Sequence, residues 1–229
     1  MKTVLITGSN RGIGLSFVKN YLSSGNWSVI ATARDIHRAQ ELNRLQNGRL
    51  EVLELDLADE KSICNLQSQL KGRPIHLLIN NSGIFIQDSL QSINQSMFID
   101  QFKVNSIGPL LVAKALLQNL TISSETTKIV NISSRMGSIE DASVDYYGYR
   151  ASKAALNMFT KVLSNDLKKI NLNICAIALH PGYVRTDMTA GKGNIPPEES
   201  VAKMVKVIEE AEIKSSGSFF HLDGFTLPW

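Results

Sequence analysis

Tyr149 and Lys153 are the two side chains whose types and spacing most directly suggest chemistry. They stand four residues apart in Y-R-A-S-K, and on a helix this spacing places two side chains on one face. An ammonium group beside a phenol favours the phenolate, so Lys153 is expected to lower the pKa of Tyr149 and prepare it for proton transfer. A tyrosine and a lysine at this spacing can also meet on a surface by coincidence, so the pair needs support from the rest of the chain.

A glycine-rich turn near the start of the chain is suited to holding a phosphate group. The apolar run 4–6 ends at Thr7, and Gly8, Gly12 and Gly14 follow before a segment with helical spacing. Glycines let the backbone turn tightly and approach a diphosphate, and the amino end of a helix favours negative charge. The spacing G-x-x-x-G-x-G differs from the common G-x-G-x-x-G fingerprint, so a connection that binds nothing is the alternative.

Alternating strands and helices are expected to position these groups, because apolar runs and helical periodicity follow one another along the whole chain. Strands are expected at 2–7, 28–33, 50–55, 75–80, 128–133, 172–178 and 217–222, and helices at about 12–24, 36–47, 59–70, 97–119, 147–169 and 197–212. This alternation predicts an α/β fold with a parallel sheet and helices on both faces. Ligands bind beyond the carboxyl ends of the strands in such folds, so residues after each strand are site candidates.

Arg34 follows the second expected strand, where an acidic residue would bind the adenosine ribose 2′-hydroxyl and repel a 2′-phosphate. The position at which we expect that acid holds Ala33, and Arg11 of the glycine turn could converge on the same place. Two guanidinium groups suit a 2′-phosphate, which favours NADP over NAD. Arg34 could also be an ordinary solvated residue, and Asp35 could pair with it or take the acid's role one position late.

Polar residues also follow the third and fourth expected strands. Asp56 could accept a hydrogen bond from an adenine amino group, or it could cap the next helix, for which Asp59 is the better candidate. The stretch 80–83, N-N-S-G, ends a buried strand. This composition indicates backbone close to a ligand, with an ordinary polar turn as the alternative.

Pro109 lies inside the helix expected at 97–119. A proline within a helix removes one N–H group and crowds the carbonyl group four residues earlier, which here belongs to Asn105. We therefore expect that carbonyl to lack its helical hydrogen bond and to be able to hold a water molecule. A kink that only adjusts packing is the alternative.

The composition limits the classes of function. A chain of 229 residues with 43% hydrophobic and 20% charged residues fits one globular domain with a full core. A net charge of +3 is too small to indicate nucleic acid binding, and no run of about 18 apolar residues is present to span a membrane. Cys64 and Cys175 lack metal-ligand spacing, so we expect two buried free thiols in a reducing cytoplasm and no metal.

Taken together, these residues resemble the classical short-chain dehydrogenase/reductase family over nearly the whole chain. The resemblance rests on T-G-S-N-R-G-I-G, Asp56, N-N-S-G, Asn105, Ser134, Tyr149-x-x-x-Lys153 and P-G-Y-V-R-T-D. The stretches Y-R-A-S-K-A-A-L-N and D-G-F-T-L-P-W are most similar to the C-factor and Sniffer-type carbonyl reductase branch. The resemblance implies a single Rossmann-type doubly wound domain over 1–229, with a seven-stranded parallel sheet of order 3-2-1-4-5-6-7.

Two positions depart from the usual family pattern. Ser82 stands where the family usually has alanine, which adds a hydroxyl group near the cofactor. Ser134 and Tyr149 lie 15 residues apart, slightly more than is usual. Because of this longer spacing, Ser133 is an alternative to Ser134 as a catalytic serine.

The resemblance implies a catalytic set of Asn105, Ser134, Tyr149 and Lys153. Tyr149 would protonate the oxygen of a carbonyl group that receives a hydride, and Ser134 would hydrogen-bond that oxygen. Lys153 would bind the nicotinamide ribose, and Asn105 would hold a water that links Lys153 to solvent. The implied cofactor contacts are Gly8, Asn10, Arg11, Gly12, Ile13, Gly14, Arg34, Asp56, Leu57, Asn80, Ser82, Gly83, Tyr149 and Lys153, with Pro181, Val184 and Thr186 seating the carboxamide.

The sequence thus predicts an oxidoreductase that transfers a hydride between NADP(H) and a small carbonyl or alcohol substrate, with NAD(H) as the second choice of cofactor. Two alternatives stay open: a C-factor-like signalling or NADP(H)-sensing protein with little turnover, and an NAD-preferring alcohol dehydrogenase. The resemblance also implies a homodimer or homotetramer formed through the helices near 97–119 and 147–169. No nucleic acid or membrane partner is expected.

Overall fold

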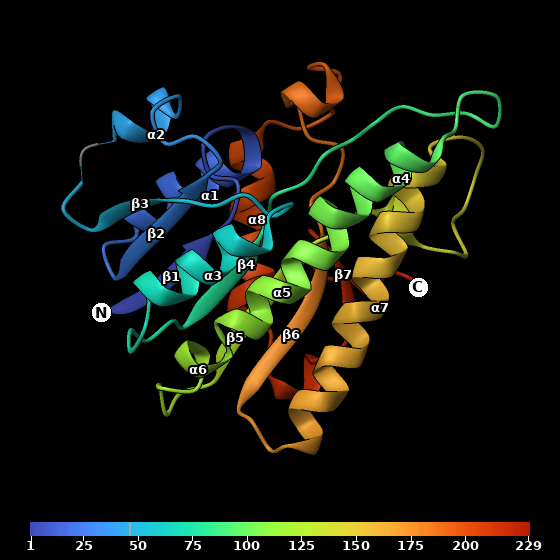
Figure 1. The fold of residues 1–229 in the computed structure, drawn as a ribbon. Coiled ribbons are helices and arrows are strands. Elements are labelled where there is room, and N and C mark those ends of the chain that lie inside the picture. Colours follow the sequence, from blue (N-terminus) through green and yellow to red (C-terminus); the bar gives the residue numbers. More distant parts are fainter. Residues whose placement is uncertain (46) are drawn as a thin grey trace.

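Seven parallel strands form one sheet at the centre of the computed structural model, which describes residues 1–45 and 47–229 (Figure 1). The strands are β1 (Lys2–Ile6), β2 (Trp27–Ala33), β3 (Leu50–Glu54), β4 (Leu77–Asn80), β5 (Thr127–Ile132), β6 (Ile174–His180) and β7 (Phe219–His221). Their order is β3-β2-β1-β4-β5-β6-β7. This confirms the expected topology, with the first strand of the chain in the interior of the sheet.

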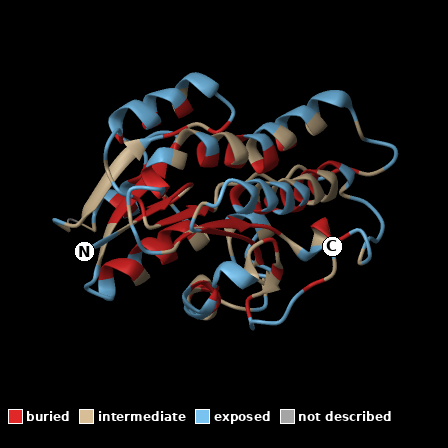
Figure 2. Ribbon diagram, turned by 90° about the horizontal axis from the view of Figure 1, so that it is seen from below, coloured by how far each residue is buried: buried red, intermediate tan, exposed pale blue. Residues whose placement is uncertain are grey.

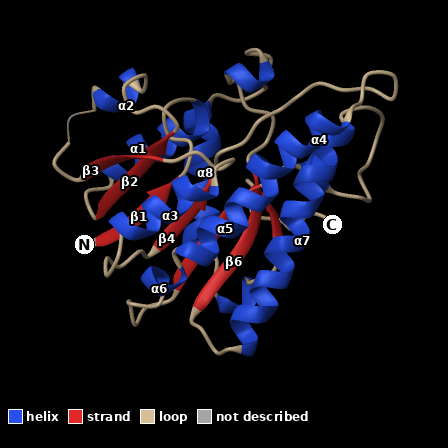
Figure 3. Cartoon of the chain, viewed as in Figure 1, coloured by secondary structure: helices blue, strands red, loops and turns tan. Residues whose placement is uncertain are grey.

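Helices cover both faces of the sheet (Figure 3). They are α1 (Gly12–Ser23), α2 (Gln40–Asn43), α3 (Glu60–Gln69), α4 (Gln95–Phe102), α5 (Gly108–Ala115), α6 (Leu117–Leu120), α7 (Tyr147–Lys169) and α8 (Pro197–Glu210). Helices α1 and α8 share one hydrophobic core with the sheet, and α3, α5, α6 and α7 share the other. No helix in the described ranges is long and apolar enough to cross a membrane.

The inner strands are apolar on both sides because each face of the sheet has its own core. Val4, Leu5 and Ile6 of β1 are fully buried, and successive side chains of a strand point to opposite faces. Val4 and Ile6 join the core that contains Phe17 of α1, whereas Leu5 joins the core that contains Leu78 of β4. The buried residues accordingly concentrate along the strands and the helix faces turned toward them (Figure 2).

The prediction of a helix at 36–47 is wrong for most of that range. Only α2 is helical, and Gln46 lies outside the described residues. The side chain of Asp35 accepts hydrogen bonds from the main-chain N–H groups of His37 (2.9 Å) and Arg38 (3.1 Å). An aspartate bonded in this way stabilises a turn in competition with a helix.

The helix expected at 97–119 is interrupted. A π-helical turn, Lys103–Ile107, separates α4 from α5, and the N–H group of Gly108 donates to the carbonyl oxygen of Lys103. Pro109 lies in the first turn of α5, directly after this π-helical turn, and has no N–H group to donate to it. The proline is therefore accommodated by a change of helix type, and such π-turns are frequent at functional sites.

The expectation of two buried cysteines holds for Cys175 and is wrong for Cys64. Cys64 lies on α3, whose buried face is formed by Ile63 and Leu66. The thiol of Cys175 donates a hydrogen bond to the carbonyl oxygen of Glu212 (3.1 Å). Only Cys175 is therefore part of the protein interior.

Candidate active site

Hydrogen bonds join the turn after β1 to the turn after β4. The hydroxyl oxygen of Thr7 accepts from the main-chain N–H groups of Asn81 (3.0 Å) and Ser82 (3.0 Å). In return, Asn81 Nδ2 donates to the carbonyl oxygens of Thr7 (2.9 Å) and Gly8 (3.0 Å). Sequence reasoning did not assign Asn81 a role, and its partners are main-chain atoms more than 70 residues away, which leave no sequence signal.

Two glycines of the first turn are required by close approach of the backbone. A Cβ atom on Gly14 would collide with the carbonyl oxygen of Gly8 and lie 2.6 Å from Asn81 Nδ2. A Cβ atom on Gly8 would lie 2.6 Å from the hydroxyl oxygen of Ser82. Gly8 and Gly12 also have φ angles of +66° and +54°, a region that residues with side chains rarely adopt.

The amino end of α1 is open to an anion. Arg11 occupies the cap position without a side-chain hydrogen bond to the helix, and the first turn contains no acidic residue. The first N–H groups of a helix have no partner within it, so here they can bind a negatively charged ligand. Asn10 and Ile13 are half-buried beside this turn. These features fit the diphosphate of a dinucleotide.

Arg11 is engaged with a distant loop. Its Nη1 atom lies 2.9 Å from Asp187 Oδ2, and both side chains are exposed. Asp187 belongs to the segment after β6, which also carries Thr186, whose Cγ2 atom would lie 3.3 Å from a Cβ atom on Gly12. The ion pair therefore joins the glycine turn to the loop after β6. Because Arg11 pairs with Asp187, the structure does not favour the expected convergence of Arg11 with Arg34.

Arg34 is exposed at the end of β2. The neighbouring Asp35 uses one oxygen for the turn described above and the other for an ion pair with Arg38 (3.2 Å). Asp35 thus pairs with Arg38, and the alternative of an Arg34–Asp35 pair is not observed. Both oxygens of the Asp35 carboxylate already have partners in the segment 35–38, so Asp35 is a poorer candidate for the acid that binds the ribose.

Asp56 and Asp59 have different roles at the start of α3. Asp59 Oδ1 accepts from the N–H group of Lys61 (2.9 Å), which confirms the expected helix cap. Asp56 Oδ1 accepts from the N–H group of Ala58 (2.9 Å), and its second oxygen has no hydrogen-bond partner among the described residues. Leu57 is buried, and its carbonyl oxygen would lie 2.8 Å from a Cβ atom on Gly108.

Asn80 serves the sheet through its side chain. Its Nδ2 atom donates to Asn131 Oδ1 (2.8 Å) and to the carbonyl oxygen of Pro109 (3.3 Å), and it is almost fully buried. Its Oδ1 atom has no partner in the described part of the chain. Because the side chain is buried within the protein, we expect any contact of Asn80 with a ligand to come from its main chain. Gly83, in contrast, lies beside Lys153, because a Cβ atom there would be 3.7 Å from Lys153 Nζ.

Lys153 and Tyr149 are both buried near the amino end of α7, with 4% and 8% of their surface exposed. Burial lowers the pKa of Lys153 to about 8, and its Nζ atom donates to the carbonyl oxygen of Ile132 (2.8 Å). Burial raises the pKa of Tyr149 to about 12, and the nearby hydroxyl of Ser134 partly opposes this rise. The expectation that Lys153 lowers the pKa of Tyr149 is wrong for this structure, because desolvation dominates and Nζ lies 5.9 Å from the phenol ring centroid.

The two serines after β5 have different hydrogen-bond partners. The Ser133 hydroxyl is buried and donates to Asn157 Oδ1 (2.6 Å). Ser134 begins the short helical turn Arg135–Gly137, and its hydroxyl oxygen accepts from the N–H group of Met136 (3.1 Å). Because Ser134 is half-buried beside Tyr149, it is the better candidate for contact with a reacting group.

Asn105 lies in the π-helical turn and is fully buried. Its Oδ1 atom accepts from the N–H group of Ile84 (2.8 Å), and its Nδ2 atom donates to the carbonyl oxygen of Ile84 (2.9 Å) and to the hydroxyl of Ser152 (3.0 Å). The side chain thus braces the loop after β4 against α7. A water held by the Asn105 carbonyl group stays a prediction.

The loop after β6 is anchored to the body of the protein. The carbonyl oxygen of Pro181 accepts from the hydroxyl of Ser200 on α8 (2.6 Å). Val184 is buried and forms a β-bridge with Ile195. Pro181 and Val184 are therefore held in place near Thr186, at the same carboxyl edge of the sheet as the glycine turn.

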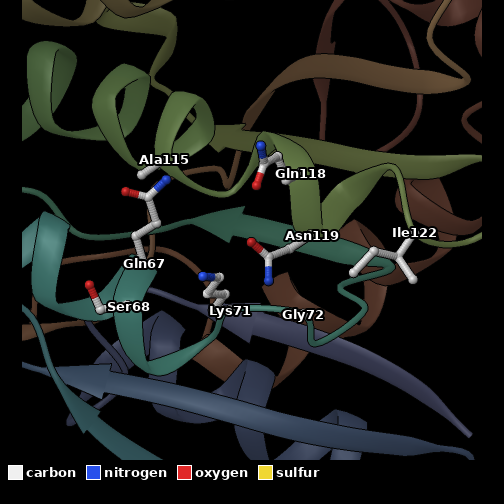
Figure 4. A pocket seen from close by; sticks show the side chains of 8 residues that line it. All are labelled: Gln67, Ser68, Lys71, Gly72, Ala115, Gln118, Asn119 and Ile122. Atoms are coloured by element: carbon white, nitrogen blue, oxygen red, sulfur yellow. The ribbon is translucent and has the colours of Figure 1, made fainter.

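A groove also lies away from these residues. It encloses about 440 Å³ between the end of α3 and the α5–α6 region (Figure 4) and is lined by Gln67, Ser68, Lys71, Gly72, Ala115, Gln118, Asn119 and Ile122. These residues precede β4 and β5 in the chain, so the groove lies toward the amino ends of the strands. A second groove of about 270 Å³ is lined by Arg135, Met136, Asp141 and Arg150, next in sequence to Ser134 and Tyr149. Of these two grooves, the second adjoins the candidate catalytic residues.

Comparison with known proteins agrees with this geometry. Residues 2–195 match the family model described as short chain dehydrogenase. The structure of NADPH-bound carbonyl reductase from chicken fatty liver is similar with a TM-score of 0.92 and 35% identity, covering 100% of this chain and 99% of that chain. The carbonyl reductase Sniffer of D. melanogaster gives 0.93 and 32%, covering 100% of both chains. C-signal of Myxococcus xanthus is 36% identical over 159 residues, which are 68% of this chain and 93% of that protein.

Replacing Gly14 with alanine should destabilise the protein through the turn after β1. The added methyl group would collide with the Gly8 carbonyl, so we expect the free energy of unfolding to fall by about 1–3 kcal/mol. Gly48→Ala is the matched control, because no atom of the described residues lies within 4 Å of its Cβ position, and it should change stability by less than about 0.5 kcal/mol. Chemical denaturation of both variants tests this, and equal stabilities would contradict the packing role of Gly14.

Proposed function

The chain belongs to the short chain dehydrogenase family of oxidoreductases, and on this premise we propose that it reduces small carbonyl compounds with NADPH. The observation that carries the proposal is the pairing of a buried, protonated phenol with a serine hydroxyl on a neighbouring element. Tyr149 has a pKa of about 12, and Ser134 is close enough to affect it. This arrangement can donate two hydrogen bonds to one carbonyl oxygen.

The chain has features that fit a nicotinamide dinucleotide. The open amino end of α1 and its glycines would hold the diphosphate, and the Lys153 ammonium group, which lies beside Gly83, would bind a ribose. When bound, the dinucleotide supplies the hydride. The residues of the chain then have to bind, orient and protonate the substrate.

Tyr149 is the proposed general acid. A phenol with a pKa of about 12 keeps its proton at neutral pH, and a group in its protonated form can neutralise the oxygen of a carbonyl as negative charge develops there. Ser134 has its oxygen fixed by the N–H group of Met136, so its own proton is free to be directed to the same oxygen. Lys153 and Asn105 would return a proton to Tyr149 from solvent.

Arg34 and one relative support NADPH over NADH. Arg34 is exposed at the end of β2, and Asp35 is used by Arg38. A guanidinium group that has no ion pair with any described residue suits a 2′-phosphate at this edge. The similar chicken liver carbonyl reductase has NADPH bound, which is consistent with this choice. An NAD-preferring alcohol dehydrogenase is the alternative that a cofactor comparison would detect.

A signalling or NADP(H)-sensing protein is the second candidate function. The similarity to C-signal favours it. A protein that only senses the cofactor has no need of a general acid, so Tyr149 and Ser134 argue for turnover. Tight binding of NADPH without turnover over a broad panel of aldehydes, ketones and quinones would favour the sensor.

Tyr149→Phe should abolish reduction because it removes the proton donor. We expect NADPH oxidation with small aldehydes, ketones or quinones to fall by about 10²–10⁴-fold, and Ser134→Ala to raise the barrier by ~3 kcal/mol, about two decades in rate. Tyr147→Phe is the matched control, since this ring is 42% exposed on the same helix, and it should keep the parent rate. A parent-like rate in Tyr149→Phe would remove the assigned acid.

The rate of reduction should fall as the pH rises through about 8. Lys153 has a lowered pKa of about 8 and loses its charge above this pH, whereas Tyr149 keeps its proton until about 12. We therefore expect kcat/KM to be constant at lower pH and to fall about tenfold per pH unit above this point. A profile recorded with saturating NADPH checks this. A constant kcat/KM up to about pH 10 would exclude Lys153 as a group that must be charged.

Arg34→Ala should weaken the binding of NADPH and leave the binding of NADH unchanged. A lost charge-assisted contact to a phosphate corresponds to about a tenfold or larger increase in Kd. Titration of the parent and the variant with each dinucleotide, followed by cofactor fluorescence, measures both constants. Equal affinities of the parent protein for NADPH and NADH would contradict the proposed preference.

A further inference from the structure

A buried carboxylate outside the proposed catalytic set caps the helix that carries Tyr149. Asp88 lies in the loop between β4 and α4 and is 5% exposed. Its Oδ1 atom accepts from the N–H group of Tyr147 (2.6 Å) and its Oδ2 atom from the N–H group of Gly148 (2.9 Å). Its carbonyl oxygen accepts from the N–H group of Tyr146 (3.1 Å). One residue therefore binds three consecutive donors at the start of α7.

We propose that Asp88 is a positioning residue for Tyr149. Tyr149 directly follows the two residues whose N–H groups the carboxylate binds. Its phenol has to meet Ser134, which comes from a different element, the turn after β5. The position of the Tyr149 phenol relative to Ser134 thus depends on the position of the first turn of α7, and Asp88 fixes that turn.

The segment 83–88 connects the cofactor side of the site to this cap. At one end, Gly83 lies beside Lys153. In the middle, both main-chain groups of Ile84 bond to Asn105, and the N–H group of Ile86 donates to Gln101 Oε1 (3.1 Å). These buried partners leave the segment little freedom. The hydrogen-bonded segment 83–88 therefore constrains the distance between Gly83, on the cofactor side of the site, and the start of α7.

Close packing restricts the start of α7 further. A Cβ atom on Gly148 would collide with Gln101 Nε2 and lie 3.1 Å from Asp88 Oδ2. The ring of Phe85 packs edge-on against Tyr149, with 5.0 Å between centroids, and also contacts the ring of Tyr146 at 5.2 Å. The phenol of Tyr149 is therefore in contact with the same segment that carries Asp88.

The backbone that enters α7 is strained and depends on these contacts. Asp145 and Tyr146 have φ angles of 60° and 58°, in the left-handed region that residues with side chains rarely occupy. Such conformations persist when surrounding interactions enforce them. Without the Asp88 carboxylate, this segment can relax and the first turn of α7 can move.

The test compares Asp88→Ala with Asp88→Asn and with Asp59→Ala. Asp88→Ala removes both acceptors, and Asp88→Asn keeps one. Asp59→Ala is the matched control, because it removes the single-oxygen cap of α3, a helix without proposed catalytic residues. The inference rests on the proposed reductase activity, so kcat and KM are measured at saturating NADPH, together with the Kd for NADPH and amide hydrogen exchange.

We expect Asp88→Ala to lower kcat by about 10–100-fold, because misplacement of a reacting group by 1 Å has effects of this size. The Kd for NADPH should stay within about twofold, Asp88→Asn should recover part of kcat, and Asp59→Ala should keep the parent kcat. Exchange should rise in the peptide that contains Tyr147–Lys153. An unchanged kcat in folded Asp88→Ala, or an equal loss in Asp59→Ala, would overturn the assignment. If Asp88→Ala does not fold, an Asp88→Asn protein with parent kcat and parent exchange would also overturn it.

Hydrogen exchange separates this inference from the proposed function. If the parent protein reduces no carbonyl compound, the proposed function fails, yet the exchange of Tyr147–Lys153 in Asp88→Asn still reports on the cap. Faster exchange confined to this peptide supports the positioning role. Unchanged exchange overturns it.

Discussion

The hydrogen bonds between the end of β1 and the end of β4 are the constraint on which the site depends. Thr7 and Asn81 exchange four bonds with main-chain groups of the opposite turn, one of them through Gly8. These bonds hold the glycine turn, and with it the open end of α1, against the stretch that leads to Gly83 and Lys153. The diphosphate end and the nicotinamide end of a dinucleotide would therefore meet one rigid unit. Without these bonds, the candidate catalytic side chains would have no fixed position relative to the glycine turn.

Burial controls the protonation of the two central groups more strongly than their proximity does. Tyr149 and Lys153 are adjacent on one helix face. Desolvation nevertheless raises the pKa of Tyr149 and lowers the pKa of Lys153, and so favours the neutral form of each group. A phenol that keeps its proton is suited to donate it, and a lysine near its titration point is suited to replace it. Exclusion of water therefore sets the protonation of both groups as much as the identity of the residues does.

The fold could be predicted from the sequence because apolar runs and periodicity are local signals. The strand order and the cap at Asp59 are confirmed by the structure. The predicted helix at 36–47 fails because the turn at Asp35 outweighs its periodicity. Asn81 and Asp88 escaped detection because they bind main-chain groups far along the chain, which have no residue type to recognise. The direction of the Tyr149 pKa shift also depends on packing that only the folded chain defines.

The interior position of β1 has a consequence for how the chain reaches this state. β1 pairs with β4 as well as with β2, so one of its edges waits for residues that are synthesised much later. Until then Val4, Leu5 and Ile6 present an apolar, unpaired edge of the kind that recruits other chains. Assembly of the glycine turn would come late, since Asn81 arrives only with β4.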